Sequence, residues 1–403
     1  MTAAGPSLTI LMLALLATHV AGMGAFLTVP VLAPAIAAEA GLPASLVGLH
    51  TALVYAGALV SGPLTGPLIR RHGAVRVLQA GMLLVALGIA LAALGHPLAL
   101  VVSAFVAGMG HGPVTPCGSH LLAGRTPPRR RSLVFSMKQA GVPAGAMLVA
   151  AVAPAIAMVF GWRAGVFAMA ATGLLVALAL QPLRAALDAG RDPTAGGAGG
   201  AALWREAAGS LGLLRIDAAL RRLTVMACCY GVAQFCFLTF FVAFQVTMLG
   251  TPLAEAGLRM ALAQAAGVLG RIAWALIADR RGARGPLLAC GLGAAAAAAA
   301  LAAAGPDWPA LLVVLAGILM GATAVGWNGV LLAETARIAP AGQVGGATAA
   351  LSFAFGVTML VAPPAFSALV GLTGGYGAGF LLCALAALGG AAAILPRRRV
   401  GQG

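Results

Sequence analysis

Runs of about twenty apolar residues follow one another along almost the whole chain, separated by short stretches rich in charge, glycine or proline. A helix needs about 20 apolar residues to cross the roughly 30 Å hydrocarbon core of a bilayer. The pattern therefore predicts an all-α membrane protein with twelve transmembrane helices. The predicted spans are 8–30, 45–69, 75–95, 99–123, 133–159, 164–183, 220–247, 256–278, 286–304, 309–333, 345–371 and 376–395.

The longest interruption of this pattern divides the spans into six and six. Residues 184–219 include a stretch of glycine, alanine and aspartate whose composition is typical of a flexible linker. The predicted organisation is therefore an N-terminal six-helix bundle over 1–183, a cytoplasmic linker over 184–219 and a C-terminal six-helix bundle over 220–403.

Composition excludes several classes of protein. With 61% hydrophobic and 8% charged residues, the chain is too poor in charge for a water-soluble domain. The six cysteines lie in apolar runs without disulfide or metal-ligand spacing, so we expect no metal and no cofactor. Neither a phosphate-binding loop nor a nucleophile–base pattern is found, so neither ATP-driven transport nor enzymatic activity is expected.

The net charge of +15 would ordinarily suggest a nucleic-acid partner. Most of the basic residues instead lie in alternate loops between spans, which membrane topology explains without nucleic acid. By the positive-inside rule these loops face the cytoplasm, so both termini are expected in the cytoplasm of a bacterium whose inner membrane holds the protein. The basic residues on this side are Arg70, Arg71, Arg76, Arg125, Arg129, Arg130, Arg131, Arg184, Arg191, Arg205, Arg215, Arg221, Arg222, Arg280, Arg281, Arg284, Arg337, Arg397, Arg398 and Arg399.

Two of these loops resemble each other. The loop after the second span reads Gly-Pro-Leu-Ile-Arg-Arg-His-Gly, and the loop after the eighth reads Ala-Leu-Ile-Ala-Asp-Arg-Arg-Gly. Aligning them pairs Gly73 with Gly282, Arg71 with Arg280, and Arg70 with Asp279. This repeat at equivalent positions indicates that the two halves share one architecture.

With these loops the whole chain resembles the major facilitator superfamily, whose signature is Gly-x-Leu-x-Asp-Arg-x-Gly-Arg. The resemblance implies two pseudo-symmetric six-helix bundles, acting as a monomer, that give alternating access to a site near the membrane midplane. It also implies a gating latch on the cytoplasmic side, in which Asp279 pairs with arginines. The latch residues are Arg71, Gly73, Asp279, Arg280 and Gly282. In the first loop Arg70 replaces the acid, so a latch there must be absent or made differently.

A finer resemblance concerns two segments within spans. The stretch from Lys138 to Pro143, with Gly-Trp-Arg163 after its span, resembles a branch of bacterial permeases. Gly270-Arg271 is similar to the eighth helix of oxalate–formate and monocarboxylate porters. That similarity implies that Arg271 holds a substrate carboxylate.

Charge inside the spans supports an anionic substrate independently. Lys138, the only lysine, and Arg271 lie within spans, whereas all nine acids fall in loops or at helix ends. A buried charge is costly and is a functional-site hypothesis by default. Both cations lie about 10 Å from the same membrane face and are expected to meet at one anion. The alternatives are that Lys138 reaches the headgroups and that Arg271 braces a nearby loop.

Six further polar or aromatic residues within spans are candidates for the substrate site, each with ordinary helix packing as its alternative. They are His111, Gln264, Tyr55, Gln234, Asn328 and Trp327. A neutral histidine at position 111 is suited to hydrogen-bonding the substrate or to taking up a proton.

The predicted function is secondary active transport of a small organic anion of the carboxylate type, by alternating access, with proton coupling or exchange. The expected partners are the lipid bilayer, the anionic small molecule and protons. The alternatives are an efflux pump for hydrophobic drugs or metabolites, and uptake of a small inorganic anion such as cyanate or nitrate.

Overall fold

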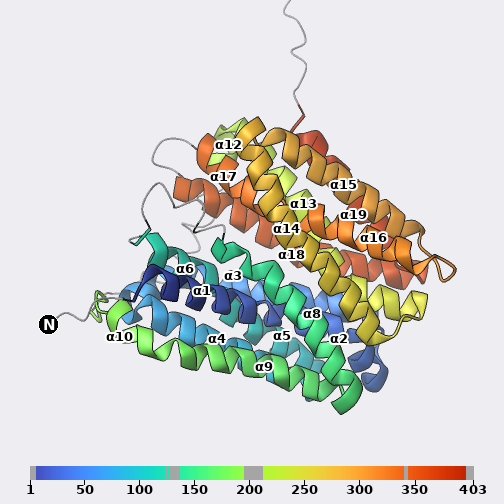
Figure 1. Ribbon diagram of the computed structural model, residues 1–403, viewed down its shortest axis with the longest axis horizontal. Coiled ribbons are helices and arrows are strands. Elements are labelled where there is room, and N and C mark those ends of the chain that lie inside the picture. Colours follow the sequence, from blue (N-terminus) through green and yellow to red (C-terminus); the bar gives the residue numbers. More distant parts are fainter. Residues whose placement is uncertain are drawn as a thin grey trace, which may run out of the picture.

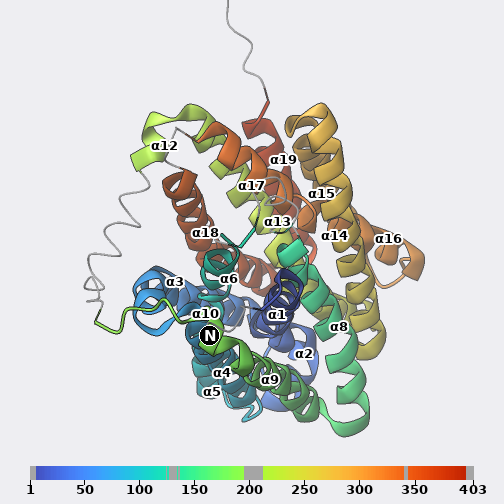
Figure 2. The ribbon, with the colours of Figure 1, turned by 60° about the vertical axis from the view of Figure 1, so that its left-hand side comes forward.

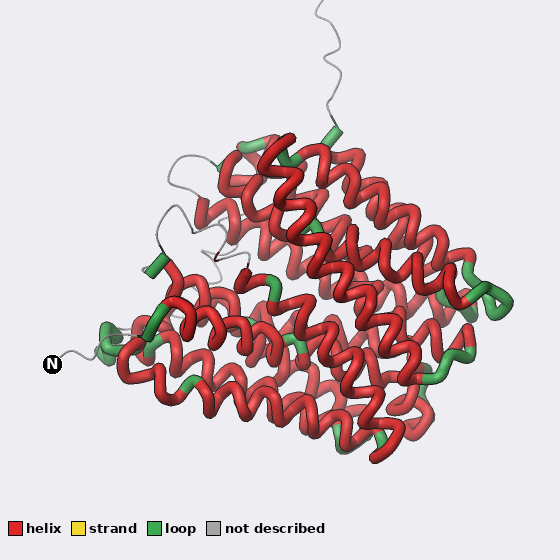
Figure 3. The backbone as a smooth tube through the Cα atoms, viewed as in Figure 1, coloured by secondary structure: helices red, strands yellow, loops and turns green. Residues whose placement is uncertain are grey.

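The computed structural model describes residues 6–123, 125–126, 134, 137–194, 212–339 and 344–395. Throughout these ranges the regular elements are helices, and no strand occurs in them. Figure 3 shows the helices joined by short loops. The predicted arginines at 129–131, 205 and 397–399 lie outside the described residues.

The first half of the chain forms six helical passages, of which the first and the fourth are interrupted near the middle. Its helices are α1 (Leu8–Gly22), α2 (Gly24–Ala40), α3 (Val47–His72), α4 (Ala74–Ala92), α5 (Pro97–His111), α6 (Val114–Ala123), α8 (Gly141–Phe160) and α9 (Trp162–Ala179). Short helices η1 (Ala44–Leu46), η3 (Gln181–Leu183) and α10 (Arg184–Leu187) connect or follow them.

The second half has the same plan, and a π-helical turn interrupts its fourth passage. Its helices are α12 (Gly212–Ile216), α13 (Ala218–Leu249), α14 (Leu253–Arg281), α15 (Arg284–Ala303), α16 (Ala310–Met320), the π-helix η4 (Gly321–Val325), α17 (Asn328–Ile338), α18 (Val344–Thr373) and α19 (Gly377–Ala393).

The helix lengths agree with the prediction of a twelve-helix membrane protein. Within the described ranges, eleven helical stretches are long and apolar enough to cross a bilayer, and α19 is a shorter apolar helix. At 17 residues, α19 is at the lower limit for spanning the hydrocarbon core. The predicted all-α membrane fold is confirmed.

The two sets of helices lie in separate halves of the molecule. Figures 1 and 2 show α1–α9 grouped on one side and α13–α19 on the other. The halves meet where α8 packs on α14, α3 on α18, and α2 on α13. The exact division of the chain at residues 184 and 219 stays a prediction.

We refer to the end of the molecule that carries the loops α3–α4 and α14–α15, with Arg70, Arg71, Arg76, Arg280, Arg281 and Arg284, as the arginine-rich face. The other end, which carries η1, is the opposite face. The interruptions of α1–α2, α5–α6 and α16–α17 lie between these two faces, and polar side chains gather beside them.

Candidate substrate and gating sites

Arg271 is a half-buried cation of α14 that reaches the other half of the molecule. Its Nη1 donates to the carbonyl oxygen of Gln139 at 3.0 Å, and its Nε donates to the carbonyl oxygen of Val325 at 3.1 Å. Within the described parts of the chain, its Nη2 has no hydrogen-bond acceptor. The ion pairs among those residues are Glu39–Arg163, Glu255–Arg259 and Glu334–Arg337. Arg271 therefore has no carboxylate partner there.

The Val325 carbonyl is available to Arg271 because the helix widens at η4. A π-turn leaves carbonyl groups outside the normal α-helical ladder and is frequent at functional sites. The Trp274 indole donates to the Ala322 carbonyl at 2.8 Å, and Asn328 Nδ2 donates to Val325 at 3.3 Å. Gly321 makes this contact with α14 possible, because a Cβ there would collide with the Ala263 carbonyl.

A polar network joins three of the predicted residues around this turn. Asn328 Nδ2 also donates to Gln234 Oε1 at 3.1 Å, so Gln234, Asn328 and Arg271 are linked through the Val325 carbonyl. Gln234 comes from α13, which places the network between three helices of the second half. The structure thus brings together residues that are far apart in sequence.

Gln264 and Trp327 lie in the same half but are fully buried. Gln264 Nε2 lies 3.7 Å from the Met260 sulfur, and its Oε1 finds no donor among the residues described. The Trp327 indole donates to the Ala324 carbonyl at 2.7 Å and packs edge-on against Tyr230. These contacts place Trp327 in the core of the second half, with its ring 6.5 Å from Phe355.

Lys138 is buried in the first half, with only 1% of its surface exposed. Its Nζ donates to Ser119 Oγ at 3.1 Å and to the Thr115 carbonyl at 3.4 Å, both in α6. Gly118 leaves room for the lysine stem against that helix. This burial excludes the alternative that Lys138 extends to the headgroups. The residue that contacts Arg271 is Gln139, the neighbour of Lys138 in the sequence, so the two cations lie close together.

Two histidines lie at the interruption of the first passage. His111 Nδ1 lies 3.0 Å from the Gly22 carbonyl, and its ring meets Phe26 edge-on. His19 is buried, its Nδ1 contacts the Leu15 carbonyl at 2.9 Å, and its Nε2 has no partner in the described ranges. His19 lies against the start of α8, because a Cβ added at Gly141, three residues beyond Lys138, would collide with the His19 Cβ. Sequence analysis names His111 as a candidate, and the structure adds His19 at the same interruption.

Aromatic side chains from both halves meet beside these residues. The Tyr55 ring lies 4.8 Å from Phe26 and 5.1 Å from Phe235, and Phe235 lies 5.8 Å from Phe355. We call Phe26, Tyr55, Phe235 and Phe355 the aromatic cluster. Sequence analysis identified only Tyr55 as a candidate, because phenylalanines in apolar spans give no signal of their partners.

At the arginine-rich face, an acid from another segment binds to the first signature loop, which joins α3 to α4. Asp188, directly after α10, accepts hydrogen bonds from the backbone N–H groups of Val75 and Arg76 at 2.9 and 3.0 Å. It thereby caps the N-terminus of α4. Gly73, with φ of 90°, leaves space for this carboxylate. The acid missing at Arg70 is thus supplied by a residue that sequence analysis assigned to a flexible linker.

In the described part of the chain, no acid packs against Gly282 of the second signature loop as Asp188 does against Gly73. Gly282 has the same backbone conformation, with φ of 82°, but the described atoms leave the space around it empty to 4 Å. Asp279, Arg280 and Arg71 are exposed. Asp279 belongs to none of the ion pairs formed by described residues. Its role in a latch stays a prediction.

Near the opposite face, the two halves are held together directly. Ser367 Oγ donates to the Ser45 carbonyl at 2.6 Å, and the hydroxyls of Thr51 and Thr239 lie 3.1 Å apart. Gly48 allows this approach, because a Cβ there would collide with Pro363 and Ser367. The halves are therefore in close contact at this face.

Two packed sets of membrane-length helices, joined by polar contacts around a cation, make this a helical membrane protein built from two halves. The sequence model of the Major Facilitator Superfamily matches residues 14–337. The chain belongs to this family.

Relatives and solved structures agree with this assignment. Two uncharacterized MFS-type transporters of Mycobacterium tuberculosis, from strains CDC 1551 / Oshkosh and ATCC 25618 / H37Rv, are 27% identical over 360 residues, covering 87% of this chain and 77% of each relative. A mutant of the nucleoside transporter NupG superposes with a TM-score of 0.76 at 13% identity, covering 96% of this chain and 98% of the other. A POT family transporter in complex with 5-aminolevulinic acid gives 0.74 at 13% identity, covering 95% and 94%. At such identities these structures show a shared fold.

Proposed function

We propose that this secondary transporter carries a small organic anion of the carboxylate type, with proton coupling or exchange. The arginine-rich face is then cytoplasmic, in the inner membrane of a bacterium. Family membership supports the secondary transporter, and the electrostatics of the site support the substrate class.

The observation that carries the proposal is the environment of Arg271. A half-buried guanidinium whose described partners are two neutral carbonyl groups would gain from a carboxylate, because charge-assisted hydrogen bonds are roughly twice as strong as neutral ones. A carboxylate that displaces the Gln139 carbonyl from Nη1 could bond Nη1 and Nη2 together, as a bidentate contact requires. The titratable side chains packed in this region are Lys138, His19 and His111, which are basic, and this favours an anion over a cation.

The same residue links substrate binding to movement of the halves. Arg271 belongs to the second half, and its acceptor Gln139 belongs to the first. A substrate carboxylate that replaces the Gln139 carbonyl removes one bond between the halves. Binding then favours a conformation in which α8 and α14 separate near this position, since a ligand stabilises the state that it binds better.

Counterflow of labelled monocarboxylates and dicarboxylates into proteoliposomes tests the proposal. We expect Arg271→Ala to lower uptake by about tenfold or more, equivalent to about 1.4 kcal/mol, and Arg271→Lys to retain part of it. Arg337→Ala is the matched control, because Arg337 is an exposed arginine paired with Glu334. Normal carboxylate transport by Arg271→Ala would contradict the proposal. If the rate of uptake does not change when a pH gradient is imposed, transport occurs by exchange and not by proton coupling.

The aromatic cluster supports a second candidate, the export of hydrophobic drugs or metabolites. Four rings from both halves offer a surface for an apolar substrate. In that case Arg271 only braces η4, and Phe235→Ala would reduce transport more than Arg271→Ala does. Competition by cyanate or nitrate in the carboxylate assay separates the organic from the inorganic anion.

A further inference from the structure

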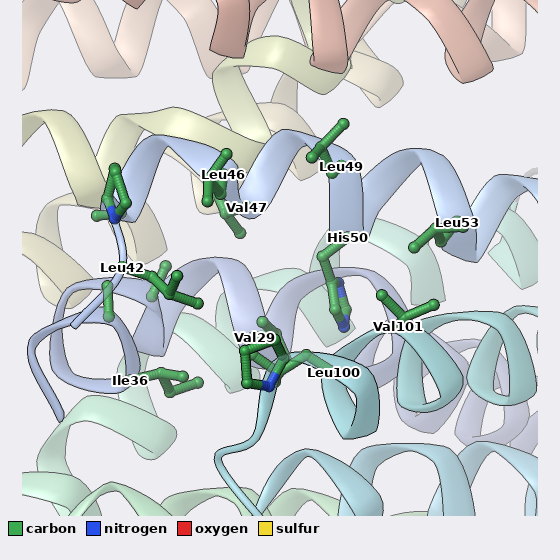
Figure 4. A pocket seen from close by; sticks show the side chains of 15 residues that line it. Val29, Ile36, Leu42, Leu46, Val47, Leu49, His50, Leu53, Leu100 and Val101 are labelled. Carbon is green, nitrogen blue, oxygen red and sulfur yellow. The ribbon is translucent and has the colours of Figure 1, made fainter. Parts of the chain in front are cut away.

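A cavity of about 220 Å³ lies near the opposite face, between α2, α3 and α5. Figure 4 shows its walls, which are formed mainly by aliphatic side chains such as Val29, Ile36, Leu53 and Leu100. It is larger than the cavity of about 150 Å³ that stays dry and binds benzene in a well-studied lysozyme variant. Its size and chemistry therefore suit an apolar molecule.

His50 provides a polar group inside these apolar walls. It is 7% exposed, and Figure 4 shows its ring pointing from α3 into the cavity. Neither Nδ1 nor Nε2 has a hydrogen-bond partner in the part of the chain that the structure describes. A buried polar group without a partner is costly, so most such groups in proteins have one. The imidazole is thus placed to bind a group that the chain itself does not supply.

We propose that this cavity is a binding site for a small lipophilic molecule with a single hydroxyl group, which hydrogen-bonds to His50. A neutral imidazole offers one donor and one acceptor, and a hydroxyl group matches either. A charged ligand is disfavoured, because His50 is the only polar side chain among the described residues of the lining.

The rim of the cavity gives such a molecule access. Leu46, Leu49 and Val101 line the cavity and are 40–48% exposed, so the cavity reaches the surface of the first half. Thr51, which contacts the second half through Thr239, lies outside this lining. All residues of the lining belong to the first half, although Ser45, between the lining residues Ala44 and Leu46, bonds to Ser367 of the second half. The proposal does not rest on the identity of the transported substrate.

Binding to the full-length protein in nanodiscs tests this proposal, with empty nanodiscs as the baseline for partitioning. The probes are 2-naphthol against naphthalene and 1-decanol against decane, so the two arms distinguish a phenol from an aliphatic alcohol. We expect at least one hydroxylated probe to bind about tenfold more tightly than its hydrocarbon, and His50→Phe to remove that difference.

Two further variants keep the test decisive if His50→Phe does not fold. Val101→Trp narrows the cavity from its rim and should weaken the binding of the hydroxylated probe and of its hydrocarbon. Leu98→Trp is the matched control on the same helix, because Leu98 is exposed and lies outside the lining; it should change neither. Equal affinity for each hydroxylated probe and its hydrocarbon in the unaltered protein would overturn the proposal, as would binding that Val101→Trp leaves unchanged.

Discussion

At the scale of single residues, Gly73 and Asp188 show how a sequence departure is compensated. The family signature has an acid where this chain has Arg70, and Asp188 approaches the same loop from beyond α9. The backbone N–H of Asp192 donates to the Arg70 carbonyl at 2.9 Å, so the segment after α10 is attached at two points. The helix end that lacks its own acid thus receives one from another segment.

Gly73→Ala should destabilise the protein more than Gly282→Ala does. Both positions have positive φ, which costs a non-glycine residue about 1–3 kcal/mol. Only at position 73 does the added methyl group also collide with the Asp188 carboxylate, with loss of a cap worth about 0.5–2 kcal/mol. Thermal unfolding in detergent measures the difference. Equal effects of the two substitutions would show that the cap contributes nothing.

Sequence analysis identified Lys138 and Arg271 because charge is rare within apolar runs. Their partners were not predictable, because Gln139 contributes a backbone carbonyl and Ser119 lies on another helix. The cap by Asp188 was missed for a related reason. The composition of residues 184–219 predicts a flexible linker on average. The burial of Asp188 depends instead on the N-terminus of α4, which lies more than 100 residues earlier in the chain.

At the scale of elements, the π-helical turn η4 shapes the surroundings of Arg271. The apolar run over 309–333 predicted one continuous span. The alanines and glycines of η4 gave no sign of a π-turn, because these residues occur in any membrane helix. The turn requires that α14 lie against Gly321, and only the packing of the two helices reveals this. The pattern of apolar residues therefore predicts that a helix forms here, but it does not predict the π-turn that widens it.

Gly321→Ala should reduce stability and transport together. The added Cβ meets backbone atoms of Ala263, which have no alternative rotamer, so α14 must move away from η4. Overpacking of this kind costs about 1–3 kcal/mol, and it shifts Arg271 from the Val325 carbonyl. Gly329→Ala is the control, since no described atom lies within 4 Å of its added Cβ. Unfolding temperature and counterflow rate are the measurements, and unchanged values in Gly321→Ala would refute the role of this contact.

At the scale of the whole molecule, direct contacts near the opposite face hold the two halves together in this structure. Thr51, Gly48 and Ser45 of the first half meet Thr239, Pro363 and Ser367 of the second near the opposite face. The helix number and the paired loops were predictable, because hydropathy and charge repeat along the sequence. The face at which the halves make contact was not predictable, because the residues that meet there are 188 and 322 positions apart in the sequence.

Replacing Thr51 and Thr239 together by cysteine should allow transport to be stopped reversibly. Their hydroxyls are 3.1 Å apart, so an oxidised pair would hold this face closed. We expect counterflow to fall on oxidation and to recover on reduction. The single variants and the unaltered protein, whose six cysteines are buried or half-buried, serve as controls for the oxidant. Transport that continues in the cross-linked protein would mean that this face does not need to open.

The attachment of Asp188 to α4 and of Asp192 to α3 fixes the first half of the chain as far as this segment. The chain after Thr194 reaches α12 at Gly212 through a stretch that can extend to about 60 Å at most, twice the roughly 30 Å thickness of the hydrocarbon core. The length of the connection alone therefore does not fix how the two halves sit against each other. Their relative position in this structure depends on the surfaces at which α8 meets α14, α3 meets α18 and α2 meets α13.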